Sequence, residues 1–220
     1  MFAKTNEDQV RFSCFWITSY LSQLESKEII DELIKSDLLN HICTEYVIES
    51  ETIIPSIRII GNLSGNEDFY VDYLFRIGVV NFVKKILPIE NNSVTKELYW
   101  ACSNLTATSR NAVIKFLEDD LIIPLTKKLL FCNAFFVKEE VLFFLGNIVA
   151  NADYLIAKKI MDWKLDDDMI LVLKENKNPD LLSLVFRVIE ELIDVNVFRK
   201  KEANGKIIFL IYRYLIFYTR

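Results

Sequence analysis

The sequence predicts an all-α protein, built as a right-handed α-solenoid of about four repeats with partial repeats at its ends. The first observation is the scarcity of turn residues, because only five glycines and four prolines occur in 220 residues. Such a chain favours long helices over turn-rich β architectures. The second is a content of 52% hydrophobic and 26% charged residues, which is typical of folded proteins. The third is a short phrase that returns along the chain at a nearly constant spacing.

This spacing is 42 or 43 residues between equivalent anchor positions of the phrase. Periods of about 40–47 residues are typical of armadillo and HEAT units, which stack because one unit cannot bury its apolar face alone. We therefore predict an armadillo-type stack, with residues 1–220 forming a single domain. The phrases with their anchors are SYLSQ at Tyr20, GNLSG at Asn62, SNLTA at Asn104 and GNIVA at Asn147.

Each anchor lies within an apolar run that predicts a long helix. A further apolar helix is expected about seventeen residues after each anchor, where a small or acidic residue precedes the apolar run. Short polar loops then lead into the next anchor helix. The anchor helices are expected near 10–22, 53–64, 94–107, 137–150 and 180–194, and the further helices at 36–47, 77–87, 119–130 and 165–175.

The two ends of the chain are expected to carry incomplete repeats. Residues 10–21 supply an anchor helix without the two helices that should precede it, and the aromatic-rich segment 196–220 is expected to pack as a final helix. Its apolar run 207–220 is interrupted by Arg213 and is too short for a membrane span of roughly 20 residues. Uncovered apolar faces at these ends favour self-association or coverage by a partner.

Composition and motifs argue against several function classes. The net charge of −5 makes nucleic acid an unexpected partner and permits a basic peptide. The four cysteines form no CxxC pair, and His41, the only histidine, has neither metal-ligand companions nor a nucleophile suggested beside it. We therefore expect no metal, no other cofactor and no enzymatic activity. The polar N-terminus shows no secretory signal, which indicates an intracellular protein.

Trp100 and Asn104 form the most informative pair in the sequence. Their i, i+4 spacing places them on one helical face, although asparagine is a poor helix former and is rarely buried without partners. In one interpretation Asn104 bonds the backbone of the neighbouring repeat and Trp100 belongs to the core. In the other, a row of such amides satisfies the backbone of an extended peptide, while the aromatic rings hold its long side chains. An exposed indole beside a free amide would favour peptide binding, and a buried pair would favour a scaffold.

The anchor helices together resemble the importin-alpha (karyopherin-alpha) family, specifically the C-terminal half of its armadillo domain. FWITSYLS, SIRIIGNLSGNED, KELYWACSNLTA and KEEVLFFLGNIVA are similar, in this order, to family repeats that carry Trp–Tyr, Arg–Asn, Trp–Asn and aromatic–Asn pairs. The resemblance covers roughly residues 10–195. The matching residues are Trp16 and Tyr20, Arg58 and Asn62, Trp100 and Asn104, and Phe143 and Asn147, with Glu97 and Glu140 at the acidic position three before the aromatic.

The resemblance implies that a concave groove binds basic nuclear localisation signals, as a nuclear import adaptor or a fragment of one would do. The protein would then occur in both cytoplasm and nucleus, with signal-bearing cargo proteins and nuclear transport receptors as partners. Arg58, Trp16 and Tyr20 would belong to the stretch between the major and minor signal sites. The minor site would comprise Trp100, Asn104, Phe143, Asn147, Glu97 and Glu140.

Three features depart from the family pattern. Ser13 stands at the acidic position of the first anchor helix, and Glu190 and Glu191 stand where the fifth should carry asparagine. No basic segment of the kind that recruits importin-beta is visible, so we expect this chain not to act as an adaptor by itself. The alternative function is a degenerate armadillo scaffold that binds other proteins through its ends or convex face and does not bind signal peptides.

Overall fold

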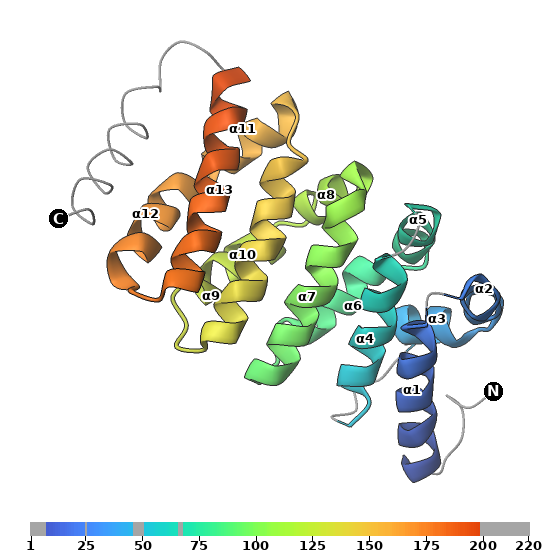
Figure 1. Ribbon diagram of the computed structural model, residues 1–220. Helices are drawn as coiled ribbons and strands as arrows, with labels where there is room; N and C mark the ends of the chain where they lie inside the picture. Colours follow the sequence, from blue (N-terminus) through green and yellow to red (C-terminus); the bar gives the residue numbers. More distant parts are fainter. Residues whose placement is uncertain (1–7, 25, 46–50, 66–67, 199–220) are drawn as a thin grey trace.

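The computed structural model describes residues 8–24, 26–45, 51–65 and 68–198. Every regular element within these ranges is helical, and the expected all-α solenoid is confirmed. Five long helices lie side by side like the rungs of a ladder (Figure 1). They are α1 (Asp8–Ser22), α4 (Ile53–Ser64), α7 (Asn92–Thr108), α10 (Phe135–Ala150) and α13 (Pro179–Phe198).

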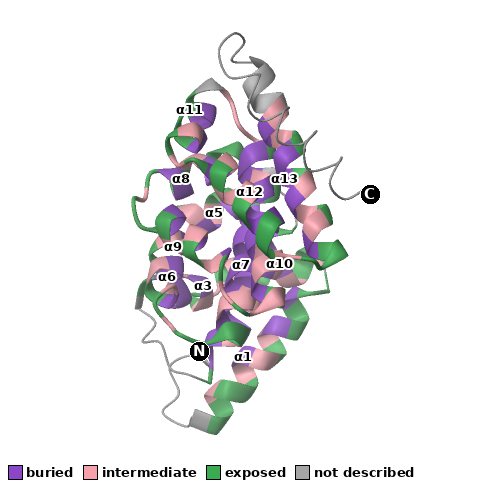
Figure 2. Cartoon of the chain, turned by 90° about the vertical axis from the view of Figure 1, so that its left-hand side faces the viewer, coloured by how far each residue is buried: buried purple, intermediate pink, exposed green. Residues whose placement is uncertain are grey.

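Shorter helices form a second layer behind the long ones. The side view in Figure 2 shows buried residues concentrated between the two layers. The apolar side of each helix faces this region and forms the core. These shorter elements are α2 (Lys27–Lys35), α3 (Leu38–Asn40), the π-helical segment His41–Glu45, α5 (Asp68–Arg76), α6 (Val79–Ile86), α8 (Arg110–Leu117), α9 (Ile122–Leu129), α11 (Tyr154–Asp162) and α12 (Leu165–Glu175).

Local sequence signals explain where several helices begin. The Asn91 side chain accepts hydrogen bonds from the backbone N–H groups of Ser93 and Val94 and so caps α7. Ser109 caps α8 through the N–H of Ala112, and Asp153 caps α11. Each capped start fixes the register of a helix within its repeat.

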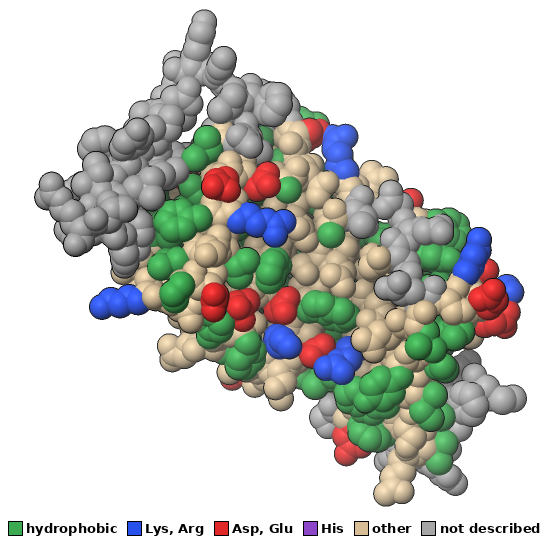
Figure 3. Space-filling model, viewed as in Figure 1, with side chains coloured by type: hydrophobic (Ala, Val, Ile, Leu, Met, Phe, Trp, Pro, Cys, Tyr) green, Lys and Arg blue, Asp and Glu red, His purple; other side chains and the backbone are tan. Residues whose placement is uncertain are grey.

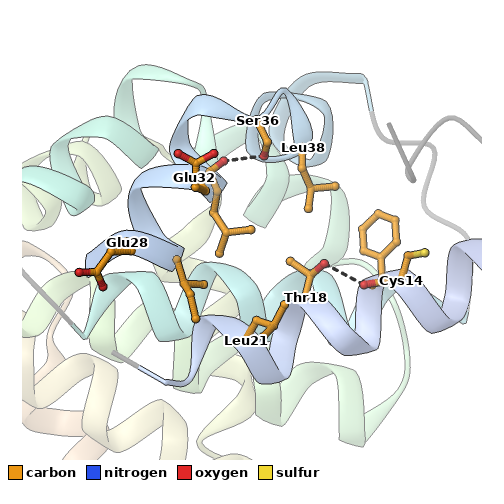
Figure 4. Close-up of a pocket in the computed structure, with 10 residues that line it drawn as sticks. Cys14, Thr18, Leu21, Glu28, Glu32, Ser36 and Leu38 are labelled. Carbon is orange, nitrogen blue, oxygen red and sulfur yellow. Dashed lines mark hydrogen bonds between the residues drawn. The ribbon is translucent and has the colours of Figure 1, made fainter. Parts of the chain in front are cut away.

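The first described helices border a cavity. A cavity of about 460 Å³ lies between α1, α2 and α3, and its lining is largely apolar (Figure 4). Within it the Thr18 hydroxyl donates to the Cys14 carbonyl, and Ser36 donates to that of Leu33. Ile17 of α1 and Leu24, which follows α1, are exposed as well. The first described helices therefore present apolar side chains to solvent.

At the other end, residues 199–220 of the expected final helix 196–220 lie outside the described ranges. No described helix is long and apolar enough to cross a membrane.

Candidate functional site

All ten residues singled out from the sequence lie on the first four long helices, and we call the surface that they form the anchor face. The i, i+4 spacing puts the aromatic or arginine and the anchor residue of each helix on one side. Acidic and basic side chains lie close together over α4, α7 and α10 on this side of the molecule (Figure 3). The residues are Trp16 and Tyr20 on α1, Arg58 and Asn62 on α4, Glu97, Trp100 and Asn104 on α7, and Glu140, Phe143 and Asn147 on α10.

The three anchor asparagines bind the long helix before their own. Asn62 Nδ2 donates to the Ser19 carbonyl at 3.0 Å and to the Ser22 hydroxyl at 3.0 Å. Asn104 Nδ2 donates to the Gly61 carbonyl at 3.1 Å, and Asn147 Nδ2 donates to the Ser103 carbonyl at 2.8 Å. The amides therefore hold neighbouring repeats in register.

This packing role uses only part of each amide. A primary amide has two N–H donors and one carbonyl acceptor, and the bond to the preceding helix uses one donor. Within the described part of the chain, Asn104 and Asn147 make no other side-chain donation, and their Oδ1 atoms are not among the buried unpaired atoms. Both residues are half-buried, so each Oδ1 remains open to a ligand, and one N–H of each amide has no described partner.

Trp100 is neither fully buried, as a scaffold would have it, nor fully exposed, as we expected of a peptide-binding indole. Its indole is half-buried and packs over Gly61 of α4, where an added Cβ would lie only 2.3 Å from Trp100 Cζ3. The absence of a side chain at Gly61 thus makes room for the ring. Phe143, the equivalent ring on α10, is 38% exposed. The Trp100 ring is therefore anchored against α4, and part of the surface of each ring remains accessible.

Arg58 is bound within the protein. Its guanidinium donates two hydrogen bonds to Glu97, from Nε to Oε2 at 3.1 Å and from one terminal nitrogen to Oε1 at 2.9 Å. The same group lies over the Trp16 ring, with Cζ 5.4 Å from the centroid, and Trp16 stands 5.8 Å from the Tyr20 ring. Glu97, expected from the resemblance to serve a ligand, is thus already paired.

Glu140 is in the opposite situation. Burial raises the pKa of its carboxyl group, Lys96 opposes that rise, and the charges of Glu139 and Glu97 add to it. No ion pair of Glu140 occurs among the residues that the structure describes. The α10 end of the anchor face therefore holds a partly desolvated carboxylate without a directly bound cation.

A cavity of about 280 Å³ crosses α1, α4 and α7 on this face. Its walls include the Tyr20 and Trp100 side chains, and Arg58, Asn62 and Lys96 also line it. Sequence reasoning missed Lys96 and the small residues that precede each anchor. Both could have been recognised from their positions in the sequence, next to residues that were singled out. Lys96 directly precedes Glu97, and the small residues are Ser19, Gly61, Ser103 and Gly146.

The row of amides does not continue onto α13. Glu190 is exposed and Glu191 is half-buried there, in place of the expected asparagine. At the α10 position equivalent to Gly61, a Cβ on Gly146 would meet Val188 at 3.6 Å, an ordinary contact. The described anchor face thus carries amides on α4, α7 and α10.

Comparison with known proteins agrees with this architecture. No protein-family model matches the chain. Importin subunit alpha-2 of Oryza sativa subsp. japonica is 26% identical over 151 residues, which cover 64% of this chain and 28% of that protein. The chain therefore spans little more than a quarter of this curated relative.

Solved structures show the same fold. A designed armadillo repeat protein in complex with the peptide (KR)4 superposes with a TM-score of 0.77 at 16% identity, covering 97% of this chain and 95% of that one. A second designed armadillo repeat protein gives 0.76 at 15% identity, with 94% and 92% covered. With the ladder of anchor helices, these likenesses show that the chain is an importin-alpha-like armadillo-repeat region.

Proposed function

We propose that the anchor face binds an extended basic peptide of the nuclear-localisation-signal type. The chain would then serve as an importin-alpha-like import adaptor, or as the cargo-binding part of one, in cytoplasm and nucleus. The observation that carries this proposal is the grouping on α7 and α10 of accessible amide atoms, half-open aromatic rings and an acid without a bound cation. These residues are Trp100, Asn104, Glu140, Phe143 and Asn147.

Each residue type has a physical task in this proposal. The open Oδ1 and N–H of Asn104 and Asn147 pair with the backbone N–H and C=O groups of an extended peptide. The rings of Trp100 and Phe143 take the apolar stem of a lysine or arginine, with a cation–π attraction of roughly 0.5–2 kcal/mol. Glu140 then meets the cationic end, and a charge partner offsets the cost of its partial desolvation.

The comparisons with known proteins also support binding of a basic peptide. The curated relative is named as an importin alpha subunit, and the designed neighbour was solved with a peptide of alternating lysine and arginine. Cargo proteins with basic signals and nuclear transport receptors are the partners that this proposal implies.

A scaffold function is the alternative, and one observation favours it. The three amide bonds to preceding helices and the Arg58–Glu97 ion pair would hold the stack together without any ligand. In that case proteins would bind elsewhere on the molecule, for example at the apolar cavity between α1, α2 and α3.

Fluorescence anisotropy with a labelled lysine- and arginine-rich peptide, at two salt concentrations, separates these functions. The proposal predicts saturable binding of micromolar affinity or tighter, lost in the double variant Trp100→Ala/Asn104→Ala. Phe143→Ala should weaken binding roughly 2- to 30-fold, as expected from losing one cation–π contact.

Phe131→Ala is the matched control. Phe131 has the same 38% exposure as Phe143 but lies in the turn after α9, outside the anchor face. Its substitution should leave the affinity unchanged. Absent binding, or binding that survives the double substitution in a folded protein, would favour the scaffold.

A further inference from the structure

The cavity between α1, α2 and α3 combines an apolar interior with an acidic edge. Leu21 of α1 and Leu38 of α3 face the space of about 460 Å³ from opposite sides, and Glu28 and Glu32 line it from α2 (Figure 4). Leu21 is 41% exposed although it belongs to the lining, so water reaches an apolar wall. Such a surface favours a ligand that carries apolar side chains beside a cation.

The two carboxylates at this edge are available to a cation. Glu28 and Glu32 are both exposed, and their i, i+4 spacing puts them on one side of α2. Glu28 accepts a hydrogen bond from the Ser26 hydroxyl, and Glu32 pairs with Lys35 at 2.8 Å. The side chains of that ion pair are 73% and 68% exposed, and such surface pairs contribute little stability and exchange partners readily.

The chain itself contains a segment of matching chemistry. Residues 206–220 read KIIFLIYRYLIFYTR and include no aspartate or glutamate. Their basic residues Lys206, Arg213 and Arg220 are spaced by seven, which places them on one side of the helix that the sequence predicts. The residues three and four positions away from Arg213 are all apolar, namely Phe209, Leu210, Ile216 and Phe217. The segment thus offers an apolar helical face with a cation at its centre.

We propose that segment 206–220 of one copy docks in the cavity between α1, α2 and α3 of a second copy, so that the protein associates head to tail. The apolar side chains around Arg213 fill the cavity, and Arg213 pairs with Glu28 and Glu32 at its edge. The contact uses none of the ten residues of the anchor face. It therefore goes beyond the proposed peptide binding and does not depend on it.

The reach of the chain argues for a second copy. α1 and α13 are the outermost of the described long helices, with α4, α7 and α10 between them (Figure 1). Packed helices lie 8–10 Å apart, so roughly 32–40 Å separate α13 from α1. Residues 199–205, which connect α13 to the segment, span at most about 23–25 Å when fully extended. The segment is thus too closely tethered to α13 to enter the cavity of its own copy.

The two sides of this contact are different surfaces. After one copy binds a neighbour, it still has either a free cavity or a free segment. A heterologous contact of this kind builds a ring or an open chain of copies and does not stop at a dimer. The assembly should therefore grow beyond a dimer as the protein concentration rises.

Sedimentation velocity of the full chain over a hundredfold range of micromolar concentrations tests the proposal. The wild type should form species larger than a dimer. Leu21→Asp puts a charge into the cavity wall, and Phe209→Asp/Phe217→Asp puts charges into the segment, so each variant alone should be monomeric. Leu121→Asp is the control, because Leu121 is 58% exposed but directly precedes α9, outside the cavity. Its association should match the wild type, and thermal melts check that every variant folds.

An equimolar mixture of the cavity variant and the segment variant tests the direction of the contact. Leu21→Asp retains an intact segment, and Phe209→Asp/Phe217→Asp retains an intact cavity. One copy of each can therefore join, but neither can add a further copy. The mixture should form heterodimers and nothing larger.

A charge exchange tests the role of the acidic edge. Arg213→Glu should weaken association about three- to tenfold, because it brings a third carboxylate to Glu28 and Glu32. Combining it with Glu28→Lys/Glu32→Lys should restore association to within about twofold of the wild type.

Several results would overturn the proposal. A wild type that stays monomeric throughout would leave the segment on its own copy. Association that stops at a dimer, or that survives Leu21→Asp, would show that the copies meet through another surface. An equal loss in Leu121→Asp would show unspecific apolar association, and a mixture that grows beyond a dimer would exclude the head-to-tail arrangement. Failure of the charge exchange to restore association would exclude the pairing of Arg213 with the acidic edge.

Discussion

In the proposed function Asn104 and Asn147 serve two purposes, because a primary amide carries more hydrogen-bonding atoms than the packing uses. Each donates one N–H to a carbonyl of the preceding long helix and keeps its acceptor accessible. From the sequence, the packing and binding interpretations of the Trp100–Asn104 pair excluded each other. In the folded chain the packing bond also fixes the orientation in which the amide faces outward, which preorganises it for a ligand.

Substitution of Asn104 should therefore lower the free energy of unfolding as well as the affinity for a peptide. Asn104→Ala removes the bond to the Gly61 carbonyl and should lower the free energy of unfolding by about 1 kcal/mol, measured by urea denaturation. Asn92→Ala, at an exposed position in the first turn of α7, is the control and should stay within about 0.5 kcal/mol of the wild type. Equal stability of the two variants would contradict a packing role for Asn104.

Glu140 predicts a pH dependence of defined sign. Because burial raises the pKa of this carboxyl in the folded chain, its protonated form favours folding. That contribution is fully present below the pKa of the unfolded chain and is lost as pH rises through the higher folded value. Glu140→Gln should therefore be more stable relative to the wild type at neutral pH than at about pH 4.

Urea denaturation across this range provides the measurement for Glu140, with Glu175→Gln, at an exposed position of α12, as the control. Basic-peptide affinity should change in the opposite sense to stability, rising with pH as Glu140 ionises, and Glu140→Gln should flatten that rise. A pH profile of binding that is identical in wild type and Glu140→Gln would exclude the carboxylate from the site.

The residue types of the candidate site were readable from the sequence, but their pairings were not. The i, i+4 spacing and the 42–43-residue period indicate which side chains share a surface. The Arg58–Glu97 ion pair joins residues 39 positions apart on different helices. Its formation depends on how far adjacent helices slide past each other, which a sequence period does not define to one residue. Glu97 was accordingly expected to meet a ligand, whereas the structure pairs it with Arg58.

At the scale of elements, the contact of α4 with α7 depends on a missing side chain. Gly61→Ala would place a Cβ 2.3 Å from Trp100 Cζ3, so the indole or the helix must shift. Overpacking of this kind typically costs 1–3 kcal/mol. We expect Gly61→Ala to be destabilised by about that amount in urea denaturation and to lose peptide affinity as Trp100 moves.

Gly146→Ala is the matched control, at the equivalent position of α10. Its Cβ would make an ordinary contact of 3.6 Å with Val188, and alanine suits a helix interior better than glycine. This variant should be as stable as the wild type or up to about 1 kcal/mol more stable. Similar losses in both variants would show that helix crowding at Gly61 is not specific to Trp100.

The period predicted the long helices better than the short ones. The run expected at 53–64 coincides with α4, and the run expected at 94–107 lies inside α7. The sequence reasoning did not single out α2, α5, α8 or α11, because it followed only the anchor helix and the apolar run about seventeen residues after each anchor.

The segment expected as one helix at 36–47 differs more clearly from the structure. It contains the short α3 and then the π-helical His41–Glu45. A π-helical turn shifts the side-chain period over only a few residues, so apolar periodicity does not reveal it.

At the scale of the whole molecule, stability should follow the stacking order. In solenoids each unit contacts only its neighbours, so a helix flanked on both sides is held more firmly than one at an end. α7 packs between α4 and α10, and α10 packs between α7 and α13, whereas among the described long helices α1 packs against α4.

Amide hydrogen exchange tests this order. Without ligand, exchange should be slowest in α7 and α10 and faster in α1, whose apolar side also borders the open cavity. Protection of α1 equal to that of α7 would contradict this order of stability.

In the proposed function, a basic peptide lies along α7 and α10 and pairs with the free atoms of their anchor amides. Nuclear magnetic resonance of the side-chain amides detects this pairing, with the Asn104 and Asn147 signals assigned from their alanine variants. On titration with (KR)4, both signals should shift saturably, while the amide of Asn178, which caps α13, stays unchanged. Binding of the peptide without any shift of the Asn104 and Asn147 amides would exclude these side chains from the binding site.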